Sequence, residues 1–283
     1  MRNFLHDFII EKHVKSALEE DIGFGDITTD FLAEETDVLS GSLKTREDGI
    51  LCGCGVFEKV FKVLSPAVNI EFYFKDGDFI ARGDKIASIK GPARFILTGE
   101  RTALNYIQRM SGIATETKKY QDKIDEAGGD YPTKIADTRK STPNFRIFEK
   151  YAVKTGGGAL HRFNLSDCAM IKDNHIKLAG SITNAVEKLR KNLSHVHKIE
   201  VECDTLEQVQ EALNCKADII MLDNMGINEI RQAVALINKR TVVEASGGVS
   251  LETVREIASV GVDIISTSAI VAKAPTLDLA LDI

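Results

Sequence analysis

The chain has 283 residues, of which 43% are hydrophobic and 28% charged, so it can bury a large core and is not intrinsically disordered. Its formal net charge of −6 argues against a nucleic-acid-binding protein, because such proteins usually carry an excess of basic residues. Charges interrupt the N-terminal segment too often for a signal peptide, and the five cysteines lack zinc-site spacing. We therefore expect a cytoplasmic protein with reduced thiols that binds neither nucleic acid nor membrane.

The first part of the chain predicts a small α+β domain. An amphipathic segment at 9–20 indicates a helix, and a long helical pattern occupies 94–127. Between them, strand patterns with the turn signals KDGD and ARGD lie at 40–47, 68–74 and 84–91. We expect an N-terminal domain over 1–130, a hinge at GGDYPT (128–133) and a catalytic domain over 131–283, whose C-terminal end is a candidate to pack back on the first domain.

Residues 131–283 alternate between short strand patterns and amphipathic helix patterns. The predicted strands are apolar, β-branched runs at 134–139, 168–173, 198–203, 218–223, 241–246 and 263–268. The predicted helices are 181–193, 205–214, 227–238 and 250–260, with N-cap candidates Ser181, Thr205, Asn228 and Ser250. This alternation, without a dinucleotide-binding glycine fingerprint, favours a closed or nearly closed parallel α/β barrel over a doubly wound sheet.

Polar groups follow nearly every predicted strand of this barrel. They are Thr138-Arg139-Lys140, Lys172-Asp173-Asn174-His175, Glu202, Asp223-Asn224, Ser246-Gly247-Gly248 and Ser266-Thr267-Ser268. Because β/α barrels carry their chemistry where the strands end, these groups predict one site at the barrel mouth. Between Arg139 and Lys177, eight Lys/Arg face only three acidic residues, which indicates an anionic ligand.

Individual residues suggest roles, each with a simpler alternative. Arg139 and Lys140 suit a multiply charged anion, although a surface ion pair would explain them too. Glu202 and Asp223 could hold Mg²⁺ or stabilise a developing cation, and a salt bridge from Glu202 to Lys172 is the alternative.

Two further features concern phosphate binding and the barrel interior. Ser246-Gly247-Gly248, followed by Ser250 at a predicted helix start, is typical of a barrel phosphate site. Because side chains alternate along a strand, Glu200 shares the inward face of Glu202.

Eight segments then carry a resemblance to a known family. They are ERTALNYIQRMSGIAT (100–115), ADTRKSTPNFR (136–146), KYAVKTGGGALHRFNLSD (150–167), MIKDNHI (170–176), IEVE (199–202), IMLDN (220–224), EASGGV (244–249) and GVDIIS (261–266). In this order they resemble quinolinate phosphoribosyltransferase, also called nicotinate-nucleotide pyrophosphorylase (carboxylating). The resemblance implies an incomplete parallel α/β barrel with an N-terminal α+β sandwich domain.

The resemblance also implies a reaction. Quinolinate and 5-phosphoribosyl-1-pyrophosphate would give nicotinate mononucleotide, CO₂ and pyrophosphate, with Mg²⁺ as cofactor, in de novo NAD biosynthesis. The implied assembly is a homodimer with a shared active site, with a hexamer as the alternative. Its partners would be the two small-molecule substrates.

Residue roles follow from the same resemblance. Arg139, His161, Arg162 and Lys172 would bind the two carboxylates of quinolinate, and Arg101 would reach in from the partner subunit. The implied catalytic residues are Lys140, Lys172, Glu202 and Asp223, the last two facing the ribose hydroxyls and Mg²⁺. The implied 5-phosphate contacts are Ser246, Gly247, Gly248 and Ser268.

The chain departs from the family pattern at Leu160, Asn144, Phe145 and Ser268. The serine at 268, where the family usually has glycine, leaves the phosphate contact there open. Three other functions compete: a ModD-like relative with a changed substrate, a Schiff-base aldolase that uses Lys172 as nucleophile, and a non-enzymatic sensor of a phosphorylated sugar. The complete carboxylate-binding set and the paired Glu202 and Asp223 favour the phosphoribosyltransferase.

Overall fold

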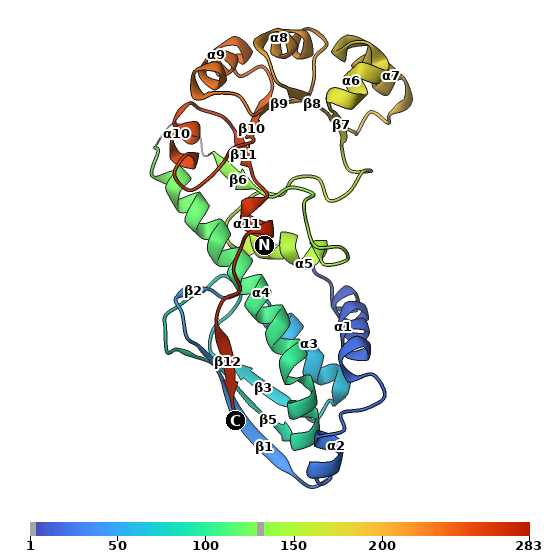
Figure 1. Cartoon of the computed structure of the whole chain (residues 1–283), viewed down its shortest axis with the longest axis vertical. Coiled ribbons are helices and arrows are strands. Elements are labelled where there is room, and N and C mark those ends of the chain that lie inside the picture. The colour runs from blue at the N-terminus through green and yellow to red at the C-terminus, as the bar shows by residue number, and fades with distance from the viewer. Residues whose placement is uncertain (1–3, 129–132) are drawn as a thin grey trace. The chain divides into compact units, whose positions relative to one another are not determined.

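The computed structural model describes residues 4–128 and 133–283, which form two compact units (Figure 1). The first unit contains the described residues up to Glu116, together with Ile147–Gly156 and Ala274–Ile283. The second contains those of Thr117–Arg146 and Gly157–Lys273. The predicted boundary at residue 130, and most of the predicted hinge at 128–133, lie outside the described residues.

The first unit is built on an antiparallel sheet with the strand order β12-β1-β5-β3. Its strands are β1 (Val38–Thr45), β3 (Asn69–Phe72), β5 (Lys85–Pro92) and β12 (Leu279–Asp282), and a separate pair is formed by β2 (Gly49–Ile50) and β4 (Phe79–Ile80). The predicted strands at 40–47, 68–74 and 84–91 are confirmed. The C-terminal β12 pairs with β1, so the end of the chain completes this sheet.

Helices of the first unit cover a core of aromatic and branched side chains. They are α1 (Asp7–Ile22), α2 (Thr29–Leu32), α3 (Cys54–Leu64), the first part of α4 (Ala93–Asp125) and α5 (Arg146–Thr155). The helix predictions at 9–20 and 94–127 are confirmed, whereas α2, α3 and α5 were not predicted. Helix α3 buries Phe57 and Phe61, one turn apart on a single face, which fixes its orientation in the core.

The second unit is an open barrel of six parallel strands in the order β6-β11-β10-β9-β8-β7. The strands are β6 (Lys134–Ala136), β7 (Ala169–Ile171), β8 (Ile199–Cys203), β9 (Ile219–Asp223), β10 (Val242–Ser246) and β11 (Ile264–Ser266). All six lie within the predicted ranges, and the incomplete parallel barrel is confirmed.

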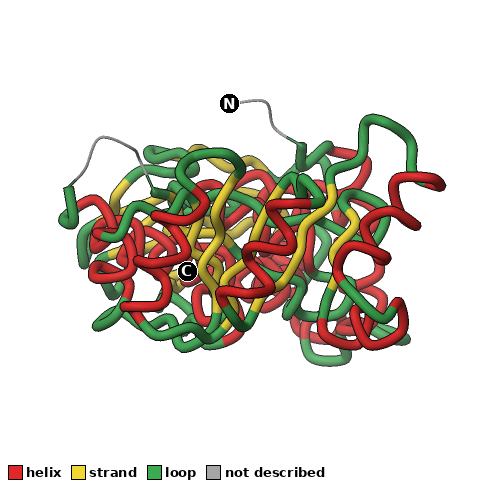
Figure 2. Tube along the Cα trace, turned by 90° about the horizontal axis from the view of Figure 1, so that it is seen from above, coloured by secondary structure: helices red, strands yellow, loops and turns green. Residues whose placement is uncertain are grey.

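Helices follow the strands on the outer side of the curved sheet, as Figure 1 shows for α7, α8 and α9. The helices of this unit are α6 (Asp173–Ala179), α7 (Ile182–Asn192), α8 (Leu206–Asn214), α9 (Ile227–Ile237), α10 (Val254–Ser259) and α11 (Ala269–Ala272). Figure 2 shows the helices, strands and loops of the whole trace from a second direction. None of the helices within the described ranges is long and apolar enough to cross a membrane.

Two of the four predicted N-caps are confirmed. Ser181 and Thr205 accept hydrogen bonds from backbone N–H groups at the starts of α7 and α8, at 3.0 and 3.3 Å. The prediction for Ser250 is wrong, because its own N–H donates to Thr253 Oγ1 in a turn and α10 begins only at Val254. Asn228 is also wrong, since Gly226 precedes α9 and its N–H donates to Glu229.

Strand β8 illustrates how the barrel orients its polar residues. Ile199, Val201 and Cys203 are buried and alternate with Glu200 and Glu202. Because successive side chains point to opposite faces of a strand, the apolar residues face the helices and both glutamates face the barrel interior. The same alternation directs Glu244 of β10 inward.

Candidate active site

A cavity of about 650 Å³ lies at the carboxyl ends of the barrel strands. Each of the six strand ends contributes to it, so the predicted convergence of polar groups is confirmed. The lining side chains singled out from the sequence are Arg139, Lys140, His161, Arg162, Lys172, Glu202, Asp223, Ser246, Gly247, Gly248 and Ser268. We call its Lys and Arg side chains the cationic rim, which consists of Arg139, Lys140, Arg162, Lys172 and Lys273.

Guanidinium groups crowd one side of the rim. Partial burial, together with the charges of Arg162 and Arg146, lowers the pKa of Arg139. Arg162 is held by a hydrogen bond of 2.7 Å from its guanidinium to the carbonyl of Cys168, and Arg146 donates to the carbonyl of Phe163 at 2.9 Å. Because like charges repel one another, an anion bound beside Arg139 would relieve the repulsion that lowers its pKa.

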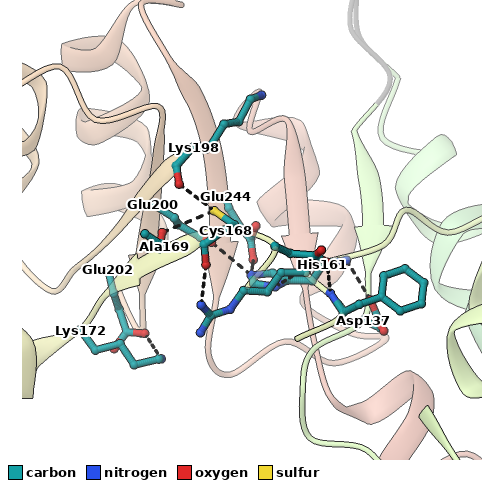
Figure 3. Close-up of polar contacts among 12 residues, drawn as sticks. Asp137, His161, Cys168, Ala169, Lys172, Lys198, Glu200, Glu202 and Glu244 are labelled. Atoms are coloured by element: carbon teal, nitrogen blue, oxygen red, sulfur yellow. Dashed lines mark hydrogen bonds and ion pairs between the residues drawn. The ribbon is translucent and has the colours of Figure 1, made fainter. Parts of the chain in front are cut away.

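Lys172 stands at the end of β7 and forms an ion pair with Glu202 (Figure 3). The salt bridge considered as an alternative for Glu202 is therefore present, and both side chains still line the cavity. The next residues begin α6: the ring Nδ1 of His175 accepts the backbone N–H of Lys172 at 3.0 Å. This contact makes His175 part of the helix start, and it does not line the cavity.

The carboxylates of Glu202 and Asp223 lie on the cavity wall at the ends of the neighbouring strands β8 and β9. Asn224 has a left-handed backbone with φ of 55°, and its side-chain amide donates to Asp223 at 2.7 Å. Mg²⁺ is often held by one or two carboxylates completed by substrate phosphates rather than by a full protein cage. This pair suits that arrangement.

The turn after β10 approaches Asn224 so closely that only glycine fits at 247. A Cβ at Gly247 would lie 2.2 Å from Asn224 Oδ1, and its φ is +86°. Gly248 is also left-handed, with φ of +62°, but has open space around it. The predicted helix start at Ser250 is absent, so this tight glycine turn, rather than a helix N-terminus, forms the wall.

Lys273 was not identified from the sequence. It follows the short helix α11, is exposed, and lines the cavity together with Ser266, Thr267 and Ser268. A short helix after β11 brings it back to the mouth, and that helix was not predicted. With the glycine turn after β10, these residues form a wall well suited to a phosphate group.

Within the strands, before their polar ends, lies a cluster that we call the His161 floor, made of the buried Glu200 and Glu244 together with His161 (Figure 3). His161 Nε2 lies 3.4 Å from Glu200 Oε2 and 3.6 Å from Glu244 Oε1. Burial and the neighbouring Glu200 raise the pKa of Glu244 to about 7. The backbone N–H of His161 donates to Asp137 at 2.9 Å.

The floor separates the main cavity from a second one of about 390 Å³. His161 and Arg162 line both cavities, whereas Glu200 and Glu244 line only the second. Leu160, one of the departures from the family pattern, also lines the second cavity. Sequence alternation pointed Glu200 inward, but nothing in the sequence paired it with Glu244.

Arg101 is the predicted site residue that does not line the cavity. It lies on α4, within the first unit, and is exposed. All five cysteines are free thiols, with Cys52 and Cys203 buried.

The open barrel, the cationic rim, the carboxylate pair and the glycine turn define a barrel enzyme for anionic, phosphorylated substrates. Models of two domains match the chain in sequence: the quinolinate phosphoribosyl transferase N-terminal domain over residues 26–111 and the C-terminal domain over residues 113–282. The chain belongs to the quinolinate phosphoribosyltransferase family.

Individual relatives support the same family assignment. The chain is 42% identical to a Synechocystis protein named "probable nicotinate-nucleotide pyrophosphorylase (carboxylating)", over 97% of this chain and 92% of that protein. A Bacillus subtilis protein of the same name is 41% identical, over 93% and 90%. The solved structure of the nicotinate-nucleotide pyrophosphorylase from Francisella tularensis superposes with a TM-score of 0.93 at 40% identity, covering 99% of this chain and 98% of that one.

Proposed function

We propose that the chain transfers the phosphoribosyl group of 5-phosphoribosyl-1-pyrophosphate to quinolinate and decarboxylates the product, in de novo NAD biosynthesis. The products are nicotinate mononucleotide, CO₂ and pyrophosphate. The observation that carries this proposal is the placement of crowded guanidinium groups, two carboxylates and a tight glycine turn on one cavity. Family membership and the names of the relatives support it.

In this proposal the dicarboxylate end of quinolinate binds at the guanidinium side of the rim. Arg139 and Arg162 can each donate two parallel hydrogen bonds to a carboxylate, and Lys172 adds an ammonium charge. Binding quinolinate would also relieve the repulsion between the guanidinium groups of the rim. This arrangement selects a base with two carboxylates over one with a single carboxylate.

The chemistry begins with the bond between ribose C1 and pyrophosphate. As that bond breaks, positive charge develops on the ribose, and the carboxylates of Glu202 and Asp223 stabilise it. Mg²⁺ held by this pair and the pyrophosphate would neutralise the leaving group, and Lys140 supports the same charge. The quinolinate nitrogen then bonds to C1 as pyrophosphate leaves. The cationic ring stabilises the electron pair that remains on C2 when the 2-carboxylate leaves as CO₂, and C2 then takes a proton from water.

The 5-phosphate binds at the wall of the cavity that follows β10 and β11. The turn of Ser246, Gly247 and Gly248 presents backbone N–H groups there, and Ser268 offers a hydroxyl. Lys273 adds an ammonium charge on the same wall. The substrate therefore spans the cavity from the phosphate wall to the guanidinium side.

The assembly belongs to the same proposal. We expect a cytoplasmic homodimer, with a hexamer as the alternative, in which Arg101 of each chain completes the site of its partner. Mixing Arg101→Ala and Lys172→Ala chains tests this directly, because we expect each variant to be inactive alone and a mixed dimer to regain one intact site. Turnover that stays absent after subunit exchange would contradict a shared site.

The ion pair between Lys172 and Glu202 speaks against the aldolase alternative, since an ammonium held by a carboxylate is not a nucleophile. The experiment that tests the proposed function is turnover of quinolinate and phosphoribosyl pyrophosphate with Mg²⁺. We expect equal amounts of nicotinate mononucleotide, CO₂ and pyrophosphate, and only slow reaction when nicotinate replaces quinolinate. Failure to form the nucleotide, or equal rates with nicotinate, would contradict it.

A further inference from the structure

The His161 floor contains a histidine whose protonation can be read from its hydrogen bonds. The backbone N–H of Arg162 donates to His161 Nδ1 at 2.8 Å. A backbone N–H is only ever a donor, so Nδ1 must carry a lone pair and no proton. The proton of a neutral ring therefore sits on Nε2, and the doubly protonated imidazolium is incompatible with this contact.

The surroundings of Nε2 suit a proton there. Glu200 Oε2 and Glu244 Oε1 lie 3.4 and 3.6 Å away, and both glutamates are buried, with 2% and 5% of their surface exposed. At these distances the contacts are electrostatic rather than short hydrogen bonds. Glu244 Oε1, which faces His161, finds no hydrogen-bond partner within the part of the chain that the structure describes, so it is open to a nearby N–H.

The same three side chains are close enough together to suggest a metal site. A metal ion on Nε2 would need the lone pair at that nitrogen, which would move the ring proton to Nδ1. Nδ1 would then point its own proton at the N–H of Arg162 and could not accept a hydrogen bond from it. The hydrogen bond of Nδ1 therefore favours a proton, and not a metal ion, between His161 and the glutamates.

The consequence reaches the cationic rim through Arg162. Its backbone is tied to the His161 ring, and its guanidinium is tied to the carbonyl of Cys168 at 2.7 Å. Asp137 accepts the backbone N–H of His161, whereas the backbone N–H of Arg162 has the His161 ring as its acceptor. The two glutamates therefore act on Arg162 through the imidazole ring of His161.

We infer that Glu200 and Glu244 are positioning residues that hold the ring proton of His161 on Nε2, which leaves Nδ1 to accept the N–H of Arg162 and thereby orients Arg162 toward the carboxylates of quinolinate. The inference rests on the proposed function for its link to quinolinate. It assigns His161 no positive charge of its own, so the charge that binds the dicarboxylate comes from Arg139, Arg162 and Lys172.

The first test is nitrogen NMR of the chain labelled with ¹⁵N-histidine, in which the two ring nitrogens of each tautomer have distinct shifts. His161→Gln identifies the signal among the six histidines by its loss. We expect the Nε2-protonated neutral form, unchanged when Mn²⁺ or Zn²⁺ is added at a stoichiometric amount. An imidazolium, the Nδ1-protonated form, or a metal-induced change at this residue would overturn the inference.

The second test is kinetic, with the double variant Glu200→Gln and Glu244→Gln. Carboxamides keep the shape of the side chains but can donate a hydrogen bond to Nε2. The ring proton of His161 is then no longer held on that nitrogen. We expect KM for quinolinate to rise about tenfold, a change of about 1.4 kcal/mol, while kcat and KM for phosphoribosyl pyrophosphate stay within about twofold. Glu187→Gln, on the exposed surface of α7, is the matched control.

Three outcomes are distinguishable. An unchanged KM for quinolinate in the folded double variant would overturn the positioning role. If the double variant does not fold, Glu244→Gln alone serves, with a smaller rise in the same KM expected and no rise contradicting the inference. A wild-type chain that does not turn over quinolinate would instead refute the proposed function, and the NMR result would still decide the tautomer.

Discussion

The cationic rim and the His161 floor belong to the same barrel but use charge in opposite ways. The rim places lysine and arginine side chains around the cavity, with Arg139, Lys140 and Lys273 exposed and Arg162 and Lys172 half-buried, where a ligand can reach them. The floor buries glutamates within the strands β8 and β10, where a ligand in the main cavity does not touch them. The comparison indicates that charged side chains around the cavity are available to bind a ligand, whereas charged side chains inside the strands position a neighbouring residue.

The largest expected effect concerns the floor and the stability of the fold. Burial and Glu200 raise the pKa of Glu244 to about 7, from an ordinary value of 4.5. The folded chain keeps a proton that the unfolded chain releases, so stability falls as pH rises between these values and the loss is complete above the folded pKa. The shift corresponds to about 3 kcal/mol.

As pH rises from about 4.5 to about 8, the free energy of unfolding of Glu244→Gln should therefore fall less than that of the wild type, as measured by urea unfolding. Glu187→Gln, which is exposed, should behave like the wild type. Parallel pH profiles for wild type and Glu244→Gln would show that this floor residue is not a buried acid.

The next effect concerns the rim and the binding of quinolinate. Arg139→Ala removes a charge-assisted contact of about 2–3 kcal/mol, so quinolinate affinity should fall roughly 30- to 160-fold. Isothermal calorimetry measures it, and Arg255→Ala, an exposed arginine on α10, is the control. Unchanged affinity in a folded Arg139→Ala variant would remove the rim from the binding site, as would unchanged affinity in Lys172→Ala.

A third pair of substitutions distinguishes the close contact between Gly247 and Asn224 from backbone strain at the phosphate wall. Gly247→Ala forces a Cβ against Asn224, and both Gly247 and Gly248 have left-handed backbones. We expect Gly247→Ala to raise KM for phosphoribosyl pyrophosphate by more than tenfold, whereas Gly248→Ala adds only the strain of about 1–2 kcal/mol. Equal effects of the two substitutions on this KM would mean that the contact with Asn224 is not what shapes the wall.

The smallest effect belongs to Lys273. Its ammonium is exposed, so its loss should cost about 1 kcal/mol, or roughly fivefold in KM for phosphoribosyl pyrophosphate, with KM for quinolinate unchanged. Lys273→Arg should restore most of the affinity, and Lys188→Ala on α7 is a neutral control. A rise in KM for quinolinate instead would move Lys273 to the other side of the cavity.

Much of the barrel could be predicted because its strands are short, apolar and β-branched. IIMLD became β9 and VVEAS became β10, each within its predicted range. Polar groups at those strand ends then predicted the rim. The prediction for Ser250 failed because its N–H donates to Thr253 in a turn that precedes α10. The prediction for Asn228 failed because Glu229 accepts the N–H of Gly226, so that α9 begins at Ile227.

Features that depend on distant pairing could be predicted only in part. The C-terminal end was expected to pack back on the first domain, but its pairing as β12 with β1, more than two hundred residues earlier, was not predicted, because its four residues carry no strand pattern of their own. The His161 floor joins β8 and β10, which β9 separates in the sheet, to a loop residue. The position of one glutamate in a strand pattern does not predict which other acidic side chain will lie beside it in the folded sheet.

The measurement that tests the central claim most directly is a crystal structure of the chain with quinolinate bound. We predict that its two carboxylates contact Arg139 and Arg162 on the guanidinium side of the rim, with the ring nitrogen facing Glu202 and Asp223. Quinolinate bound at the phosphate wall beside Gly247, or outside this cavity, would contradict the account.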